Sequence, residues 1–298
     1  MKKQKNNISK IQSWILASRP RTLPAAIVPV MVGSALAMHD GKFQIVYSIV
    51  ALLCSALIQI GTNFTNDLYD YLKGADNKNR KGPLRVMISG LISKKEMTFG
   101  IILVFSTAFL LGLYLVYSTS WIILIVGVVS IIAGLAYTAG PFPLAYNGLG
   151  DLFVFLFFGL VGTSGTYFLH HQKITAEVLI AAIPVGALIT NILVVNNYRD
   201  IEEDKQAGKN TLAVKLGKIF SLYQYIILNA LSFIVPLIFF IFYNYHFLVL
   251  LPFLTLPLIF NLIKMLSTES STGLNKTLEL TAKESALFGL LFSIGLIV

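Results

Sequence analysis

The 298-residue sequence is poor in the side chains that soluble proteins use most. Only 12% of its residues are charged and 56% are hydrophobic, whereas charged residues make up about 25% of an average soluble domain. The mean hydropathy is +0.75. The single cysteine, Cys54, excludes an intramolecular disulfide, and the four histidines do not have the spacing of a zinc site. These shortages exclude a soluble enzyme and indicate an integral membrane protein.

Long apolar runs recur from one end of the chain to the other. A membrane-spanning α-helix needs about 20 mainly apolar residues, and nine runs come close to that length. We therefore expect an all-α fold in which nine transmembrane helices surround a central cavity, formed by a single domain over residues 1–298. The predicted helices are 22–38, 43–64, 99–117, 120–138, 148–169, 178–196, 219–242, 246–264 and 280–298.

The basic residues are distributed unevenly between the two sides of the predicted bundle. Of the 23 lysines and arginines, only Lys42 and Lys173 fall on the side opposite the N-terminus. Positive charge accumulates in the cytoplasmic loops of membrane proteins, so residues 1–21 and the loops 65–96 and 197–218 are predicted to be cytoplasmic, at the cell membrane. The same asymmetry accounts for the net charge of +9, so no nucleic-acid partner is expected.

Acidic residues are scarce, and half of the 14 lie in two clusters, after the second and the sixth predicted helix. A carboxylate next to hydrocarbon is unfavourable unless something pairs with it, so two clusters at the same depth predict a shared cation. Side chains three or four residues apart share one face of a helix, and both clusters have this spacing. The clusters are Asn63-Phe-Thr-Asn66-Asp67-Leu-Tyr-Asp70 with Asp76 beyond it, and Asn196-Asn197-Tyr-Arg199-Asp200-Ile-Glu202-Glu203-Asp204.

The side chains of the clusters indicate a magnesium-bound diphosphate. Carboxylate and amide oxygens without histidine or cysteine form a site for a hard cation, and Mg²⁺ prefers one or two carboxylates together with phosphate oxygens. The basic residues between the acids would contact the anion directly. The predicted metal ligands are Asp67, Asp70, Asp76, Asp200 and Asp204, and the predicted diphosphate contacts are Asn63, Asn66, Lys73, Arg80, Arg85, Arg199 and Lys209.

A diphosphate site inside a membrane bundle predicts a ligand whose other end is lipid. An isoprenyl diphosphate has this character, and its tail would lie among the aromatic side chains Phe153, Phe155, Phe157 and Phe158. Further side chains on the cytoplasmic side are candidates for binding a second substrate, although interfacial tyrosines and arginines also serve simply as membrane anchors. These candidates are Tyr137, Asn196, Asn197, Arg19 and Arg21.

The motifs resemble those of the UbiA superfamily of membrane aromatic prenyltransferases, and more closely those of its 1,4-dihydroxy-2-naphthoate branch in menaquinone biosynthesis. The chain has Tyr137-Thr-Ala-Gly-Pro141 where the ubiquinone and haem branches carry a basic residue after the tyrosine. It departs from the expected pattern at Leu84-Arg85, where a Thr-Arg pair is usual. The matching stretches are Ala17-Ser-Arg19-Pro-Arg21-Thr-Leu-Pro24-Ala, Asn66-Asp67-Leu-Tyr-Asp70, Gly74-Ala-Asp76, Arg80-Lys-Gly82-Pro83, Asn196-Asn197-Tyr-Arg199-Asp200 and Gly208-Lys209-Asn-Thr211-Leu-Ala-Val.

The resemblance implies a Mg²⁺-dependent membrane transferase. In such an enzyme the catalytic residues Asp67, Asp70, Asp200 and Asp204 would hold the metal with a polyprenyl diphosphate, and the bond to the diphosphate would ionise. The allylic cation would then be captured by 1,4-dihydroxy-2-naphthoate, which loses carbon dioxide to give a demethylmenaquinone.

The residues themselves leave alternatives open. The acid clusters concern only the prenyl donor, so prenylation of 4-hydroxybenzoate or homogentisate is a second hypothesis. A secondary transporter is a hypothesis from another class, since intramembrane acids also carry protons and ions.

Overall fold

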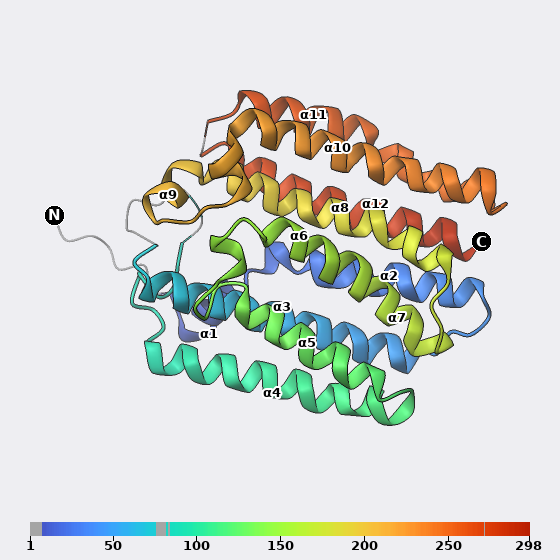
Figure 1. The fold of residues 1–298 in the computed structure, drawn as a ribbon, viewed down its shortest axis with the longest axis horizontal. Helices are drawn as coiled ribbons and strands as arrows, with labels where there is room; N and C mark the ends of the chain where they lie inside the picture. The colour runs from blue at the N-terminus through green and yellow to red at the C-terminus, as the bar shows by residue number, and fades with distance from the viewer. Residues whose placement is uncertain (1–7, 76–81, 83, 271) are drawn as a thin grey trace.

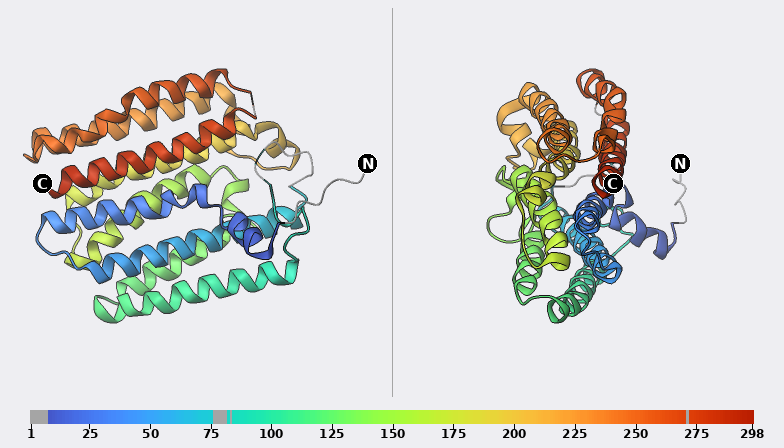
Figure 2. Two further views of the ribbon diagram at one scale, coloured as in Figure 1. Left: turned by 180° about the vertical axis from the view of Figure 1, so that it is seen from behind. Right: turned by 90° about the vertical axis from the view of Figure 1, so that its right-hand side faces the viewer.

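The computed structural model describes residues 8–75, 82, 84–270 and 272–298. In these residues all regular structure is helical, as predicted, and the long helices run side by side along the long axis of the molecule (Figure 1). Helices α8 and α12 lie between α10 and α11 on one side and α2 on the other (Figure 1 and Figure 2). The elements are α1 (Lys10–Ser18), η1 (Pro20–Thr22), α2 (Pro24–His39), α3 (Ile45–Leu72), α4 (Lys94–Ser118), α5 (Ile122–Ala136), η2 (Leu144–Tyr146), α6 (Gly150–Val154), η3 (Phe155–Val161), α7 (Gly162–His171), α8 (Ala176–Arg199), α9 (Ile201–Gln206), α10 (Leu212–Phe242), η4 (Phe247–Thr255), α11 (Leu256–Thr268) and α12 (Leu274–Ile297).

Each of the nine predicted segments contains a helix, but the count of nine spans is not confirmed. Within the described residues, seven helices are long and apolar enough to cross a membrane. The segment from Lys10 to His39 is a bent pair, with an angle of 52° near Pro24. Arg19 ends α1 in a left-handed conformation, and the prolines that follow start new helical turns because they cannot continue the preceding one. Helix α5 has only 15 residues, a length of about 22 Å at 1.5 Å per residue.

Helices α6, η3 and α7 form one continuous span, Gly150–His171, with a π-helical stretch at its centre. This stretch lies against α8, where Gly159 and Gly186 allow the two backbones to approach closely. A Cβ atom on Gly159 would lie 2.7 Å from the Cα of Gly186. Small residues have this role in membrane bundles, because helices in lipid associate by close packing.

The core lies around α8, most of whose residues are buried between α10, α12, η3 and α2. The aromatic side chains Phe233, Phe239, Phe288 and Phe292 pack edge-on or tilted in this region. By contrast, α5 has no buried residue and packs against α3 and α4. The bundle is therefore tightly packed on the α8 side and looser on the α5 side.

The carboxyl ends of α3 and α8, which carry the two acid clusters, lie at the same end of the bundle. Figure 1 shows this end at the left, next to α1 and the short helix α9. Helices α3 and α8 therefore deliver their polar ends to one region.

Candidate active site

Lys209 connects the two acid clusters. Lys209 follows α9, and its Nζ lies 3.1 Å from Oδ1 of Asp70 on α3 and 4.0 Å from Oδ1 of Asp204 on α9. The lysine side chain is only 15% exposed, so this contact is largely shielded from solvent. The ends of two helices that are distant in sequence therefore form one charged site.

The carboxylates of α3 are paired with cations from distant segments. Asp67 accepts a hydrogen bond from Arg19 at 2.5 Å and another from Nη1 of Arg85. Asp70 lies 3.8 Å from Nη2 of Arg85 and accepts a 2.8 Å hydrogen bond from the hydroxyl of Tyr146. Both carboxylates are almost completely buried, so these partners offset the cost of removing two negative charges from water.

The amides and the lysine of the first cluster bind to neighbouring segments. Asn63 donates to the carbonyl oxygen of Ser18 at 3.0 Å, and Asn66 accepts from the hydroxyl of Thr138. Lys73 donates to the carbonyl oxygen of Thr138 at 2.9 Å, and its Nζ lies 4.2 Å from the centre of the Tyr146 ring. Burial, assisted by the charge of Lys209, lowers the pKa of Lys73, while Asp70 opposes the shift.

In the second cluster, Asp200 pairs with the arginine directly before it. Arg199 donates from Nε and Nη2 to the two carboxylate oxygens of Asp200, at 2.6 and 2.7 Å. The same guanidinium also binds the side-chain oxygens of Asn196 at 2.8 Å and Asn275 at 2.9 Å. Such a two-pronged contact fixes the orientation of both groups. Arg199 is only 1% exposed and does not line the cavity described next.

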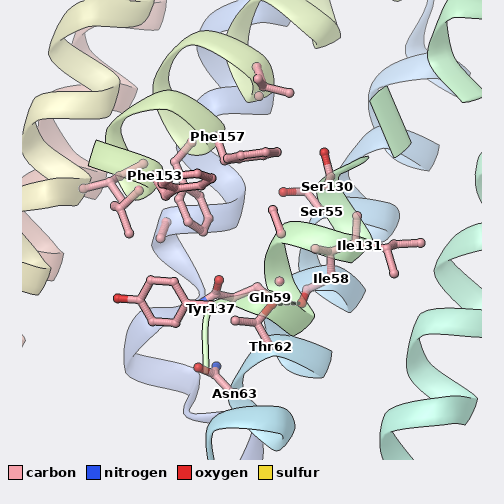
Figure 3. A pocket seen from close by; sticks show the side chains of 18 of the residues that line it. Ser55, Ile58, Gln59, Thr62, Asn63, Ser130, Ile131, Tyr137, Phe153 and Phe157 are labelled. Atoms are coloured by element: carbon pink, nitrogen blue, oxygen red, sulfur yellow. Dashed lines mark hydrogen bonds between the residues drawn. The ribbon is translucent and has the colours of Figure 1, made fainter. Parts of the chain in front are cut away.

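A cavity of about 400 Å³ begins at the two clusters and continues into the bundle. Figure 3 shows Tyr137 and Asn63 toward one side, with Phe153 and Phe157 facing Ser55, Ile58 and Ile131 further along. Three of the four phenylalanines predicted to lie along a lipid tail, Phe153, Phe157 and Phe158, line this cavity, and Phe155 does not. The cavity therefore combines one charged end with a long apolar section.

Eleven of the predicted site residues line the cavity. Asp67, Lys73 and Arg199 do not line it and instead contact residues that do. Arg21 lies apart, 65% exposed and 3.8 Å from Glu279. Asp76 and Arg80 lie outside the described residues. The predicted residues that line the cavity are Arg19, Asn63, Asn66, Asp70, Arg85, Tyr137, Asn196, Asn197, Asp200, Asp204 and Lys209.

The donor set fits a metal that arrives together with an anion better than a metal held by protein alone. Among the described residues, no group of three or more acidic, histidine or cysteine side chains is close enough to hold a metal ion. The carboxylates are separated by cations instead, as Lys209 separates Asp70 from Asp204. Mg²⁺ commonly takes one or two carboxylates and completes its shell with phosphate oxygens and water. Cations beside the carboxylates are suited to contact those phosphates.

Three polar residues of the site were missed by sequence reasoning. Tyr146 contacts Asp70 and the ammonium groups of Lys73 and Lys209. Thr138 and Asn275 hold Asn66 and Arg199 respectively. None of the three belongs to a repeating pattern that would mark it in the sequence. Thr138 and Tyr146 could have been noticed only because they lie close to Tyr137 in the sequence.

Comparison with known proteins identifies the family. The model of the UbiA prenyltransferase family matches residues 26–280, a range that contains both acid clusters. The chain belongs to this family. The resemblance predicted from the motifs is thereby confirmed, and this UbiA family member is a multi-pass membrane protein and a prenyltransferase.

Two relatives match this UbiA family member along nearly its whole length. The 1,4-dihydroxy-2-naphthoate octaprenyltransferase of Haemophilus influenzae is 35% identical, with 100% of both chains covered. The protein of the same name from Escherichia coli is 35% identical over 97% of this chain and 96% of its own. Among solved structures, a UbiA homolog from Archaeoglobus fulgidus bound to DMAPP and Mg²⁺ shares the fold, with a TM-score of 0.70 and 18% identity over 96% of this chain and 99% of that one.

Proposed function

We propose that this protein transfers a polyprenyl group from a polyprenyl diphosphate to 1,4-dihydroxy-2-naphthoate, releasing diphosphate and carbon dioxide and forming a demethylmenaquinol, the reduced form of a demethylmenaquinone. The relatives named above carry this activity in their names and align with nearly the full chain. The observation that carries the proposal is the contact of Lys209 with both Asp70 and Asp204 at the mouth of an apolar cavity. A diphosphate with a lipid tail has the same division into a charged end and an apolar end.

Arg19, Arg85 and Lys209 would bind the diphosphate group. All three line the cavity, and each already contacts a carboxylate, so together they form a positive surface held in a fixed position. Positive groups placed where negative charge develops lower the barrier to breaking the carbon–oxygen bond, because the charge on the departing diphosphate increases in the transition state.

Asp67, Asp70, Asp200 and Asp204 would hold Mg²⁺ with the diphosphate, and Asp76 is a further proposed ligand. When bound, Mg²⁺ would neutralise charge on the diphosphate and make it a better leaving group. The family relative bound to DMAPP and Mg²⁺ supports the use of this metal in the fold. The structure offers oxygen ligands of the required chemistry at the polar end of the cavity.

The aromatic acceptor would bind beside the polar end, near Tyr137 and the amides Asn196 and Asn197, all of which line the cavity. In this position a ring carbon of the acceptor can attack the allylic cation as the diphosphate leaves. The new carbon–carbon bond forms at the ring carbon that carries the carboxylate, which leaves as carbon dioxide. Apolar walls beyond this point exclude water that would convert the cation to an alcohol.

We further propose that residues 1–298 act as a single domain in the cell membrane, with residues 1–21 and the loops 65–96 and 197–218 in the cytoplasm. The distribution of lysine and arginine supports this orientation. The acid clusters lie at helix ends rather than in mid-membrane, which disfavours a transporter.

The proposal is tested by incubating the purified protein with Mg²⁺, octaprenyl diphosphate and 1,4-dihydroxy-2-naphthoate, and analysing the products by mass spectrometry. We expect a prenylated, decarboxylated naphthalene product that disappears with EDTA and returns when Mg²⁺ is added in excess. Parallel reactions with 4-hydroxybenzoate and homogentisate identify the acceptor. A product from either of these, with none from the naphthoate, would contradict the proposal.

A further inference from the structure

Three helical glycines in this chain have no packing reason to be glycine. For Gly112 on α4, Gly127 on α5 and Gly165 on α7, an added Cβ atom would meet nothing within 4 Å, and their φ angles are negative. Every other glycine inside a described helix has a positive φ or a neighbouring atom within 3.1 Å of the Cβ position. Glycine within a helix is less favourable than alanine by about 1 kcal/mol. Another requirement must therefore explain these three positions.

All three glycines line the cavity at a similar depth. Gly112 lies six residues before the end of α4, Gly127 five residues after the start of α5, and Gly165 six residues before the end of α7. At 1.5 Å per residue, they lie roughly 7 to 9 Å from these helix ends.

These three helix ends lie at the same side of the bundle. Tyr47 donates to the carbonyl oxygen of Ser118 at the end of α4, and the backbone of Gln44 donates to His170 near the end of α7. The residues that begin α3 therefore contact the ends of both α4 and α7, which places all three glycines far from the acid clusters.

The cavity is open to the outside of the bundle near this level. Four apolar side chains from α4 and α5 line the cavity and remain 36 to 39% exposed. In a membrane this exposed surface faces lipid, so a long apolar ligand can lie partly in the cavity and partly in the bilayer. The four side chains are Phe109, Leu113, Leu124 and Val128.

The length of the donor determines whether its tail reaches the glycines. Gly127 lies ten residues from Tyr137, which is roughly 15 Å along α5. An extended chain covers about 3.3–3.6 Å per three bonds, so a geranyl group of eight main-chain bonds spans about 9–10 Å and an octaprenyl group of 32 bonds about 35–38 Å. A geranyl tail ends before the glycines, whereas an octaprenyl tail must pass them.

We propose that Gly112, Gly127 and Gly165 determine which donor lengths the enzyme accepts, by keeping the cavity wide where a long prenyl tail passes. The inference rests on the proposed function, since it concerns the donor of that reaction. The missing side chains leave space at one depth on three different helices, and a large side chain at any of these positions would fill the cavity beyond the reach of a short donor.

The test compares octaprenyl and geranyl diphosphate as donors for Gly127→Phe and Gly165→Phe. We expect kcat/KM for the octaprenyl donor to fall at least about tenfold and that for the geranyl donor to change less than about threefold, a discrimination of the size that small changes in an apolar pocket produce. Gly127→Ala and Gly165→Ala should show the same preference against the octaprenyl donor to a smaller degree, because a single Cβ atom fills less of the cavity than a phenyl ring.

Ile125→Phe is the matched control for added bulk. Ile125 lies two residues from Gly127 on α5, is 50% exposed and does not line the cavity, so this variant should transfer both donors normally. Equal losses for the two donors in the glycine variants, or undiminished octaprenyl transfer, would overturn the inference.

A binding measurement separates this inference from the proposed function. If the wild type transfers neither donor, the proposed function fails. Titration calorimetry of both diphosphates then tests the inference without turnover. A loss of affinity in the phenylalanine variants that is confined to the octaprenyl donor supports it, and equal affinities in all variants contradict it.

Discussion

The two acid clusters resemble each other in sequence, but the cations that contact their buried carboxylates within the described residues come from different distances along the chain. In the α3 cluster, Asp67 and Asp70 are paired with cations 15 to 139 residues away, namely Arg85, Arg19 and Lys209. In the α8 cluster, Asp200 is paired with the residue directly before it. The cations of the first cluster line the cavity, whereas the buried Arg199 does not. The comparison suggests that the first cluster binds ligand through its cations, while the arginine of the second cluster positions its carboxylate.

Asp70→Asn would have the largest effect on activity, because this carboxylate contacts Arg85, Lys209 and Tyr146 at once. The substitution keeps the shape of the side chain but removes its charge. We expect kcat for prenyl transfer to fall at least about 100-fold, as when a preorganised electrostatic group is removed from other active sites. The measurement is product formation at saturating donor and acceptor.

Glu202→Gln is the control for Asp70→Asn. Glu202 lies on α9 within the second cluster, but it is exposed and does not line the cavity. It should keep nearly full activity. If both variants lost activity to the same extent, the loss would reflect net charge at this end of the bundle rather than the site.

Arg199→Met and Arg85→Met test the comparison through stability. Removing Arg199 takes away the two hydrogen bonds that its guanidinium donates to the buried Asp200, and breaking a buried pair in this way costs about 3–5 kcal/mol. Removing Arg85 leaves Asp67 with Arg19, so we expect lost activity with a smaller loss of stability. Thermal unfolding in detergent, followed beside prenyl transfer, separates the two effects.

The double variant Arg199→Met/Asp200→Asn completes this test. It removes the buried charge along with its partner and should unfold at a higher temperature than Arg199→Met alone. Equal unfolding temperatures for Arg199→Met and Arg85→Met would show that the two clusters do not differ in the way described.

Among these variants, Arg19→Gln and Arg21→Gln should have the smallest effects on prenyl transfer. They are also the most closely matched pair, because the two arginines lie two residues apart. Arg19 donates to Asp67 and lines the cavity, and a hydrogen bond to a charged group contributes about 1.5–3 kcal/mol, so we expect about a tenfold rise in KM for the donor. Arg21 is an exposed partner of Glu279, and exposed ion pairs contribute about 0–1 kcal/mol. Kinetics with varied donor concentration measure both, and equal effects would place Arg21 at the site as well.

The prediction from sequence succeeded where a feature repeats. The nine apolar segments all contain helices, and of the helically spaced residues Asn63, Asp67 and Asp70, the first and last line the cavity. It failed where a single residue determines a contact or a local bend determines the length of a helix. The contact between Tyr146 and Asp70 joins residues 76 positions apart, and no pattern in either segment signals it. The break before Pro24 and the short α5 likewise changed the count of helices able to span the membrane.

The sequence by itself determined that this protein is a helical membrane protein with polar ends on two of its helices, because hydrophobic length and side-chain spacing act locally. Only the tertiary structure decided that Lys209 joins the two clusters, that Arg199 is buried against Asp200 and that Arg21 does not line the cavity. These outcomes depend on how helices pack and bend, and small residues such as Gly159 and Gly186 set that packing through the close approach of backbones.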